Sequence, residues 1–227
     1  RYQDSTGPYK FRLLNMATNA ESITPGTPLT RTLTPENETD IYTFSATAGN
    51  RFNFDSQSVT GAPNAYWRLV DPFGNVVPST NVPLYNDFGP VTITYSGTYT
   101  LLVEGYVNEV GASASYTFNV APLSNVVIPP VSGALMNLDT SLANSTISAS
   151  GEIDNYKFVI PDGPDVLVYV DGQTDDGNMH WTITGPSGTF SNYFTNSDWN
   201  NSTPFMKLAA GMPSVKAPRV AAALTCR

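Results

Sequence analysis

The fold of this chain is decided by the heptapeptide Glu38-Thr39-Asp40-Ile41-Tyr42-Thr43-Phe44 and by its second copy, Glu152-Ile153-Asp154-Asn155-Tyr156-Lys157-Phe158, which lies 114 positions later. Tyr42 and Phe44 are kept as Tyr156 and Phe158, whereas Ile41 is replaced by Asn155. Successive side chains of a β-strand point to opposite faces. We therefore expect a strand whose Tyr42/Phe44 face is buried.

The offset of 114 holds without a gap across some 65 residues. The matched positions are aromatics, turn formers and the acidic pair, as in Thr32 with Thr146, Trp67 with Trp181, Pro72 with Pro186, Gly74 with Gly188, Pro90 with Pro204 and Gly97 with Gly211. A constant offset of this kind indicates an internal repeat.

A second correspondence uses an offset of 107, which aligns Tyr9-Lys10-Phe11 with Tyr116-Thr117-Phe118. Residues 116–120 are predicted to form the last strand of the first repeat, so residues 9–14 are interpreted as the last strand of a preceding one. The predicted organisation is a trailing strand and linker (1–19), one whole repeat (20–122), a second, truncated repeat (123–211) and a tail that does not match (212–227).

Short segments with period-two alternation of apolar residues fill the repeats, and turn formers separate them. Tyr99, Leu101 and Val103 alternate in one segment, and Asp71-Pro72-Phe73-Gly74 has the composition of a type I turn. Seven or eight such strands in about 100 residues predict tandem antiparallel β-sandwich domains, all-β and jelly-roll-like, with the second incomplete.

The ordered set of these segments resembles the bacterial pre-peptidase C-terminal domain family. The resemblance covers nearly all of residues 29–120 and, more weakly, 146–211, and is carried by 38–44, Ala48-Gly49, 67–74, 96–101 and 116–120. It implies a jelly-roll-like sandwich in a secreted or surface-exposed bacterial protein. Such domains are not catalytic, commonly follow secreted peptidases, and in some relatives bind calcium or polymers such as collagen.

Charge and composition limit the partners. The chain of 227 residues has a net charge of −8, with one His and one Cys. An acidic surface repels nucleic-acid phosphates, and no apolar run reaches the roughly 18 residues of a membrane span. The sequence offers no Gly-x-Ser-x-Gly or His-Glu-x-x-His motif. We therefore expect no nucleic-acid partner, no membrane span and no catalytic residues.

The acidic residues before the repeated strand are the candidate calcium ligands. They are Glu36, Glu38 and Asp40, with Glu152 and Asp154 as the counterparts of the last two. Calcium takes six to eight oxygen ligands, which closely spaced carboxylates can supply. In the competing interpretation, these acids cap a turn and face water.

Aromatic residues in loop-like segments are the candidate binding surface: Tyr85, Phe88, Tyr106, Tyr193 and Trp199. Trp67 and Trp181 alternate with Leu69 and Ile183, which predicts a place in the core instead.

The basic, Ala-rich tail 212–227 breaks the repeat, because a strand like residues 98–103 is expected after Gly211. Two explanations stay open: a shifted reading frame, or a native end that packs as a helix.

The sequence thus predicts a non-catalytic extracellular or cell-surface module that serves spacing, stabilisation or adhesion. Its expected partners are neighbouring domains of the same polypeptide and an extracellular protein or polysaccharide. The alternative is an accessory substrate-binding domain of a secreted peptidase or other hydrolase, with calcium as a stabilising ion in either case.

Overall fold

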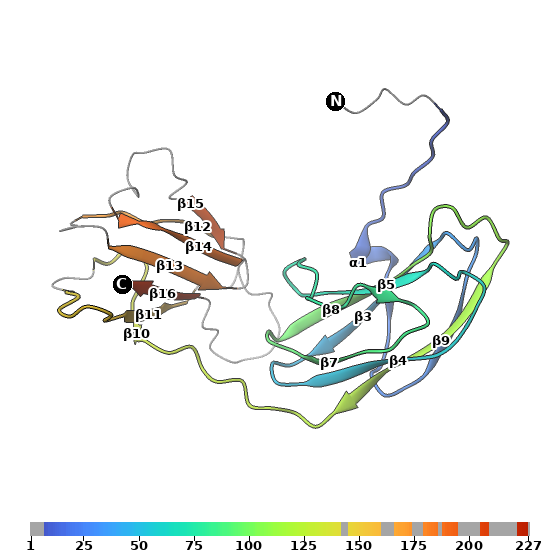
Figure 1. The fold of residues 1–227 in the computed structure, drawn as a ribbon, viewed down its shortest axis with the longest axis horizontal. Coiled ribbons are helices and arrows are strands. Elements are labelled where there is room, and N and C mark those ends of the chain that lie inside the picture. Colours follow the sequence, from blue (N-terminus) through green and yellow to red (C-terminus); the bar gives the residue numbers. More distant parts are fainter. Residues whose placement is uncertain are drawn as a thin grey trace.

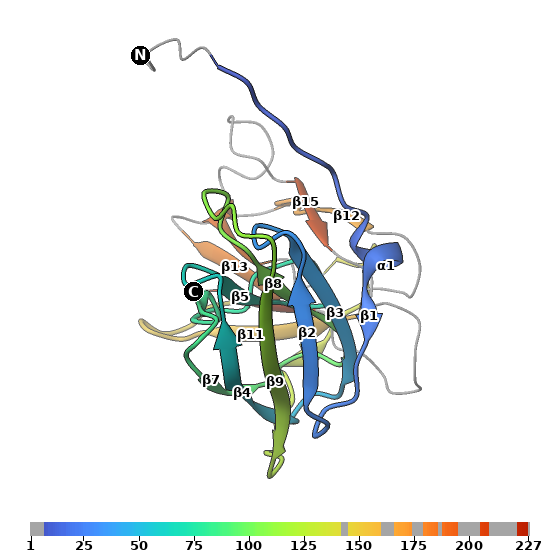
Figure 2. The same ribbon diagram turned by 90° about the vertical axis from the view of Figure 1, so that its right-hand side faces the viewer.

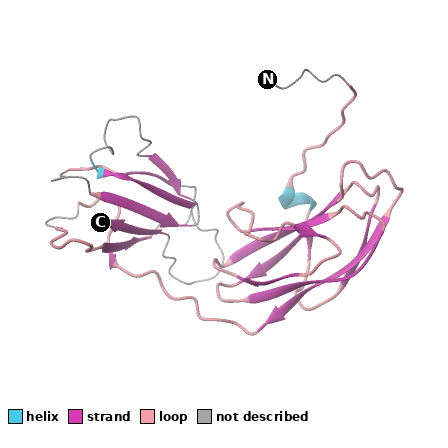
Figure 3. Ribbon diagram, in the orientation of Figure 1, coloured by secondary structure: helices cyan, strands magenta, loops and turns pink. Residues whose placement is uncertain are grey.

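The structure is a computed structural model that describes residues 7–141, 145–159, 166–173, 179–185, 188–194, 205–208 and 222–226. Strands dominate it (Figure 3), and the α-helix α1 (Met16–Asn19) has four residues. The Asn15 side chain accepts a hydrogen bond from the Ala17 amide and caps α1. The predicted all-β antiparallel fold is confirmed.

Two sheets face each other between residues 21 and 123 (Figures 1 and 2). The five-stranded sheet has the order β1-β3-β8-β5-β6 and the four-stranded sheet has the order β2-β9-β4-β7. Every pairing is antiparallel except that of β1 with β3. The strands are β1 (Glu21–Ser22), β2 (Leu29–Leu33), β3 (Thr39–Ala46), β4 (Arg51–Thr60), β5 (Tyr66–Val70), β6 (Val82–Pro83), β7 (Phe88–Thr92), β8 (Gly97–Glu104) and β9 (Ala114–Leu123). We refer to this set as the first sandwich.

The core of the first sandwich is aromatic. Tyr42 and Phe44 are buried on one face of β3, as the repeat predicts. Trp67 packs edge-on against Phe88 and Phe54, with ring centroids 5.0 and 6.3 Å away. Such pairs contribute about 0.5–1.5 kcal/mol each beyond the area that they bury. Ile41 is buried as well, but on the outer face of β3 and apart from this core.

The turn after β5 forms as its sequence predicts. The Asp71 side chain accepts hydrogen bonds from the amides of Phe73 (2.9 Å) and Asn75 (2.8 Å). The Gly74 amide donates to the Asp71 carbonyl at 3.1 Å. Asp71 therefore stabilises a turn, since its carboxylate satisfies backbone donors that the strands leave unpaired.

A second set of strands follows from residue 134. One sheet has the order β10-β11-β16-β13-β14, and β12 pairs with β15 in another. We refer to them together as the second set. Its strands are β10 (Ala134–Leu135), β11 (Asp154–Phe158), β12 (Val166–Tyr169), β13 (His180–Gly185), β14 (Gly188–Tyr193), β15 (Phe205–Leu208) and β16 (Ala222–Cys226).

Strand β16 is a strand, whereas one of the two explanations left open for the Ala-rich tail predicts a helix. Residues Ala222–Cys226 pair antiparallel with β11 on one side and with β13 on the other. A central strand satisfies its backbone donors and acceptors through both neighbours. That gain outweighs the preference of Ala for helices, because propensity is a weak determinant once tertiary pairing is available.

An extended connector, residues 124–133, joins the first sandwich to the second set (Figure 1). Its start is fastened to the β3–β4 turn, where the Val126 amide donates to the Gly49 carbonyl at 2.9 Å. Gly49 has φ +92°, and a Cβ there would lie 2.3 Å from the Val126 carbonyl oxygen. The close approach of the connector therefore requires glycine at this position. Within the described residues, no helix is long and apolar enough to cross a membrane.

Candidate functional site

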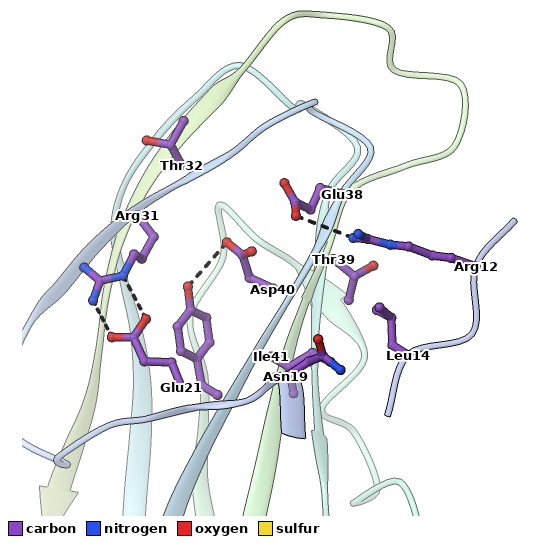
Figure 4. A pocket seen from close by; sticks show the side chains of 11 residues that line it. Arg12, Leu14, Asn19, Glu21, Arg31, Thr32, Glu38, Thr39, Asp40 and Ile41 are labelled. Atoms are coloured by element: carbon purple, nitrogen blue, oxygen red, sulfur yellow. Dashed lines mark hydrogen bonds and ion pairs between the residues drawn. The ribbon is translucent and has the colours of Figure 1, made fainter. Parts of the chain in front are cut away.

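A shallow polar hollow of about 250 Å³ lies over β1, β2 and β3 and includes two of the candidate calcium ligands, Glu38 and Asp40 (Figure 4). Glu21 on β1 and Arg31 on β2 form an ion pair across it, in which Arg31 Nε donates to Glu21 Oε2 at 2.9 Å. Arg12, which precedes α1, approaches Glu38 at 3.5 Å. Each arginine therefore pairs with a carboxylate and reduces the attraction of that carboxylate for a metal ion.

Asp40 is the end point of a hydrogen-bond network. The Tyr116 hydroxyl donates to Asp40 Oδ2 at 2.5 Å, the Tyr42 hydroxyl reaches the same oxygen at 3.4 Å, and the two hydroxyls contact each other. The network joins the two sheets, since Asp40 and Tyr42 lie on β3 and Tyr116 on β9.

The environment of this network changes the pKa of its members. Burial raises the pKa of Asp40, and the hydrogen bond from Tyr116 offsets part of that rise. Burial is also the main cause that raises the pKa of Tyr116 and of Tyr42 above the ordinary tyrosine value. Both tyrosines therefore stay protonated and can donate hydrogen bonds to the Asp40 carboxylate.

Glu38 accepts a hydrogen bond from the Thr34 amide at 3.0 Å and so closes the turn before β3. Its counterpart Glu152 accepts hydrogen bonds from the Ser148 hydroxyl (2.8 Å) and from the amides of Ser148 and Ala149. These bonds, with that of the Ser148 hydroxyl first, lower the pKa of Glu152. The interaction joins the residues i and i−4 in both copies, which supports the turn-capping interpretation.

Asp154 repeats the position of Asp40 in a reduced form. The Tyr156 hydroxyl donates to Asp154 Oδ2 at 3.3 Å and lies 3.0 Å from Ser145 Oγ. Within the described ranges, no three His, Cys, Asp or Glu side chains lie close enough together to hold a metal ion. Calcium binding by these carboxylates stays a prediction from the sequence.

Glu36 contacts a different part of the chain from Glu38 and Asp40. Its Oε2 accepts a hydrogen bond from the Gly111 amide at 3.1 Å, and the Glu36 amide donates to the Gly111 carbonyl at 3.3 Å. Glu109, in the same β8–β9 loop, is buried and accepts hydrogen bonds from the Asn64 amide (2.7 Å) and side chain (3.2 Å). Two acids thus fix the β8–β9 loop to the loops that precede β3 and β5.

Two of the candidate surface tyrosines, Tyr85 and Tyr106, follow strands that leave the five-stranded sheet at the same end. Tyr66, the first residue of β5, pairs with Pro83 on β6 and with Glu104 on β8. Tyr85 and Tyr106 each lie two residues beyond these pairing partners and are 58% and 47% exposed. Tyr66 is exposed too. We call these three residues the tyrosine cluster.

Hydrogen bonds from β4 and β5 fix the backbone of the loop that carries Tyr85. Trp67 Nε1 donates to the Asn86 carbonyl at 3.1 Å, and the Ser56 hydroxyl donates to the Leu84 carbonyl at 2.6 Å. The Ser56 amide also donates to the Asp87 carboxylate at 2.7 Å. Fixed backbones reduce the conformational entropy that a loop loses on binding. The tyrosine cluster is therefore presented in a preorganised form.

The other candidate surface residues are placed differently. Phe88 is 6% exposed and stacks on Phe54 with ring centroids 4.2 Å apart, so its place on a binding surface is corrected to a place in the core. The register of β7 on β4 shifts between Phe52 and Phe54, and this irregularity turns Phe88 inward. Tyr193 is exposed on β14 and packs edge-on against His180. Trp199 lies outside the described residues.

Sequence reasoning missed Tyr66, Glu109 and Tyr116 as contributors to these sites. Glu109 and Tyr116 find their partners 45 and 76 residues away along the chain, a separation that no local pattern reveals. The alternation Tyr66-Trp67-Arg68-Leu69 does hold a signal for Tyr66, because Trp67 and Leu69 face the core and Tyr66 must face away from it.

No protein-family model matches this chain, and no curated protein matches it. Among solved structures, the chain is similar to PliG of Aeromonas hydrophila, a periplasmic inhibitor of g-type lysozyme. The identity is 17%, the TM-score is 0.35, and the similarity covers 46% of this chain and 96% of PliG. A similarity of this size carries no argument about function.

Proposed function

We propose that this chain is a non-catalytic extracellular module that binds another macromolecule through the tyrosine cluster of the first sandwich. The observation that carries the proposal is the position of three exposed tyrosines at one end of the five-stranded sheet, Tyr66 at the start of β5 and Tyr85 and Tyr106 on the adjacent loops, which hydrogen bonds from buried side chains hold in place. Tyrosine supplies a large contact area with few rotatable bonds and a hydroxyl that forms hydrogen bonds, which is why binding surfaces are rich in it.

The chemistry around the cluster favours a protein over a polysaccharide as the partner. Val107 and Val110 lie on the same β8–β9 loop as Tyr106, and both are strongly exposed. Branched aliphatic side chains add apolar area that a protein surface can bury. Sugar rings, by contrast, stack on aromatic faces and gain little from valine.

The acids around the cluster are assigned positioning roles. Glu109 and Glu36 keep the β8–β9 loop, which carries Tyr106, close to the loops that precede β3 and β5. In this proposal the sandwich is a rigid support, and the loops at one end of it contact the partner. Spacing within a larger secreted or surface protein is compatible with the same arrangement, because the connector departs from the end of β9 and not from the loops that carry the cluster.

The test is a binding assay on immobilised protein and polysaccharide probes. We suggest collagen and gelatin on one side, and chitin and cellulose on the other. The double variant Tyr85→Ser/Tyr106→Ser should weaken binding to a protein probe by about tenfold or more, the value expected when two exposed aromatics lose their buried area. Val127→Ser, at a strongly exposed position of the connector, is the matched control.

Binding that the double variant leaves unchanged would contradict the proposal, as would binding to no probe. Retention on chitin or cellulose alone would replace the protein partner by a polysaccharide. A preference for gelatin over collagen would favour the alternative role, an accessory domain that holds unfolded substrate for an attached peptidase.

A further inference from the structure

Three loops meet at the end of the first sandwich that carries the tyrosine cluster. They are the β2–β3 loop (34–38), the β4–β5 loop (61–65) and the β8–β9 loop (105–113). The β2–β3 and β8–β9 loops lie side by side (Figure 2), and the Glu36 amide donates to the Gly111 carbonyl between them. The three loops contain three glutamates and no Lys, Arg or His. Their own side chains therefore supply negative charge and nothing to balance it.

Glu109, on the β8–β9 loop, is a buried carboxylate with one oxygen unpaired. The residue is 8% exposed, and its Oε1 accepts both hydrogen bonds from Asn64, at 2.7 and 3.2 Å. Its Oε2 is buried and accepts no hydrogen bond from the described residues. An ionised carboxylate offers about four lone-pair sites, and burial of a charge without a counter-ion is costly. Glu109 therefore lacks a cationic partner at Oε2.

Glu36 places a second carboxylate against the same loops. Its Oε2 accepts a hydrogen bond from the Gly111 amide at 3.1 Å. A Cβ on Gly61 would lie 2.7 Å from Glu36 Oε1, and a Cβ on Gly111 would lie 2.0 Å from Oε2. These two glycines therefore leave space for the carboxylate between the β4–β5 and β8–β9 loops. Among the described residues, Glu36 and Glu109 form no ion pair.

The two carboxylates reach neighbouring points of the β4–β5 loop. Glu36 lies against Gly61, and Glu109 accepts from Asn64, which is three residues further along the chain. Three residues span at most about 10 Å of chain. The two side chains are therefore near enough for their free oxygens to approach one common ion.

We propose that Glu36 and Glu109 bind one divalent cation of the calcium type between the β4–β5 and β8–β9 loops. Two carboxylates match the charge of such an ion. Calcium takes about six to eight oxygens in an adaptable geometry, so backbone carbonyls and water can complete the set, whereas magnesium demands a near-ideal octahedron. With two charged ligands, we expect a dissociation constant of about 10⁻⁴–10⁻³ M, as in other extracellular modules.

This site differs from the hollow over β1, β2 and β3. In the hollow, Glu38 pairs with Arg12, and Asp40 accepts a hydrogen bond from Tyr116. Both acids there have partners, whereas Glu109 Oε2 has none among the described residues. Cation binding at Glu109 is also independent of whether the tyrosine cluster contacts a partner.

The first test is titration of the full chain with calcium chloride by calorimetry. Glu109→Gln should weaken binding by about tenfold or more, because one of two charged ligands is lost while Oε1 can still accept from Asn64. Asp55→Asn, which removes the same charge on β4, and Glu38→Gln in the hollow are the controls and should bind as the wild-type chain does.

Three results would overturn the proposal. One is the absence of binding at calcium concentrations up to about 10 mM, well above the expected dissociation constant. Another is an equal loss in Asp55→Asn, which would indicate diffuse attraction to the net charge. The third is a loss in Glu38→Gln with binding retained in Glu109→Gln, which would place the ion in the hollow.

The second test separates a metal ligand from a purely structural acid. It is urea unfolding in chelator and in calcium, followed by the fluorescence of Trp67 in a chain that carries Trp181→Phe and Trp199→Phe. In chelator, Glu109→Gln should be at least as stable as the wild-type residue, because it removes a buried charge without a counter-ion. At calcium of about ten times the dissociation constant, the unfolding equilibrium constant should fall about elevenfold with Glu109 and stay unchanged with Gln. An equal loss of stability in both solutions would show that Glu109 only holds Asn64, and would overturn the proposal.

Discussion

Tyr116→Phe removes one hydroxyl from the buried network that joins β9 to β3. A hydrogen bond to a charged group contributes about 1.5–3 kcal/mol to stability, and a bond between neutral groups about 0.5–1.5 kcal/mol. Asp40 is only partly buried, so water replaces some of what the carboxylate loses. We therefore expect the first sandwich to lose roughly 1.5–2 kcal/mol at pH 7.

The pH dependence of this loss follows from the pKa of Asp40, which burial raises in the folded protein. The folded state then binds the proton more tightly than the unfolded state does. Asp40 contributes stability that is fully present below the unfolded pKa and is lost as pH rises through the folded pKa. Tyr116 opposes that loss because it donates to the ionised carboxylate. The destabilisation by Tyr116→Phe should therefore grow between pH 3 and pH 7.

The assay is urea unfolding followed by the fluorescence of Trp67, with Trp181 and Trp199 replaced by Phe so that only the first sandwich reports. With a urea slope of about 1–3 kcal/mol per M, the midpoint should fall by roughly 1 M at pH 7. Tyr156→Phe, which removes the corresponding hydroxyl of the second set, should leave the Trp67 transition in place. A midpoint change below about 0.3 M at pH 7, or equal changes at pH 3 and pH 7, would refute the reasoning.

Three further predictions concern packing, loop order and calcium. Gly105→Ala should destabilise the first sandwich by about 3 kcal/mol or more in the same urea assay, because the added Cβ would lie 1.9 Å from the Glu36 carbonyl oxygen. Gly74→Ala is the control and should cost about 1 kcal/mol, because Gly74 has φ +87° but open space around it. Glu109→Ala should speed amide hydrogen exchange at Asn64 by roughly tenfold while exchange in β3 stays unchanged, since the buried acceptor of that amide is lost; equal acceleration in β3 would point to global destabilisation instead. If the acids before β3 bind calcium, a thermal melt should shift upward on adding calcium relative to chelator, and Glu38→Gln, which changes a carboxylate of the hollow, should abolish the shift. An unchanged midpoint would remove the calcium prediction.

The parts of the fold that the sequence predicts are those with local patterns. The pairs Tyr42/Phe44 and Trp67/Leu69 alternate along single strands, and each lies in the core as period two requires. Asp71 caps its turn because Asp, Pro and Gly occupy the positions that a type I turn prefers. In these cases, the information lies within four or five consecutive residues.

The parts that were missed depend on distant partners. Phe88 precedes Gly89-Pro90, a dipeptide typical of loops, yet stacking on Phe54 turns it inward. Strand β16 is Ala-rich and matches no earlier segment, and its identity as a strand comes from backbone pairing with β11 and β13. The tyrosine cluster forms because pairing brings Pro83 and Glu104 to Tyr66, which no property of the separate loops predicts.

The fastening of the connector to Gly49 determines how far the second set can range from the first sandwich. Beyond the hydrogen bond at Val126, residues 127–133 remain before β10, and seven extended residues reach at most about 25 Å. A pull on the second set is therefore transmitted to the β3–β4 turn before it reaches the end of β9. The first sandwich therefore meets tension at a turn that joins one strand of each sheet, β3 and β4, and both sheets share the load.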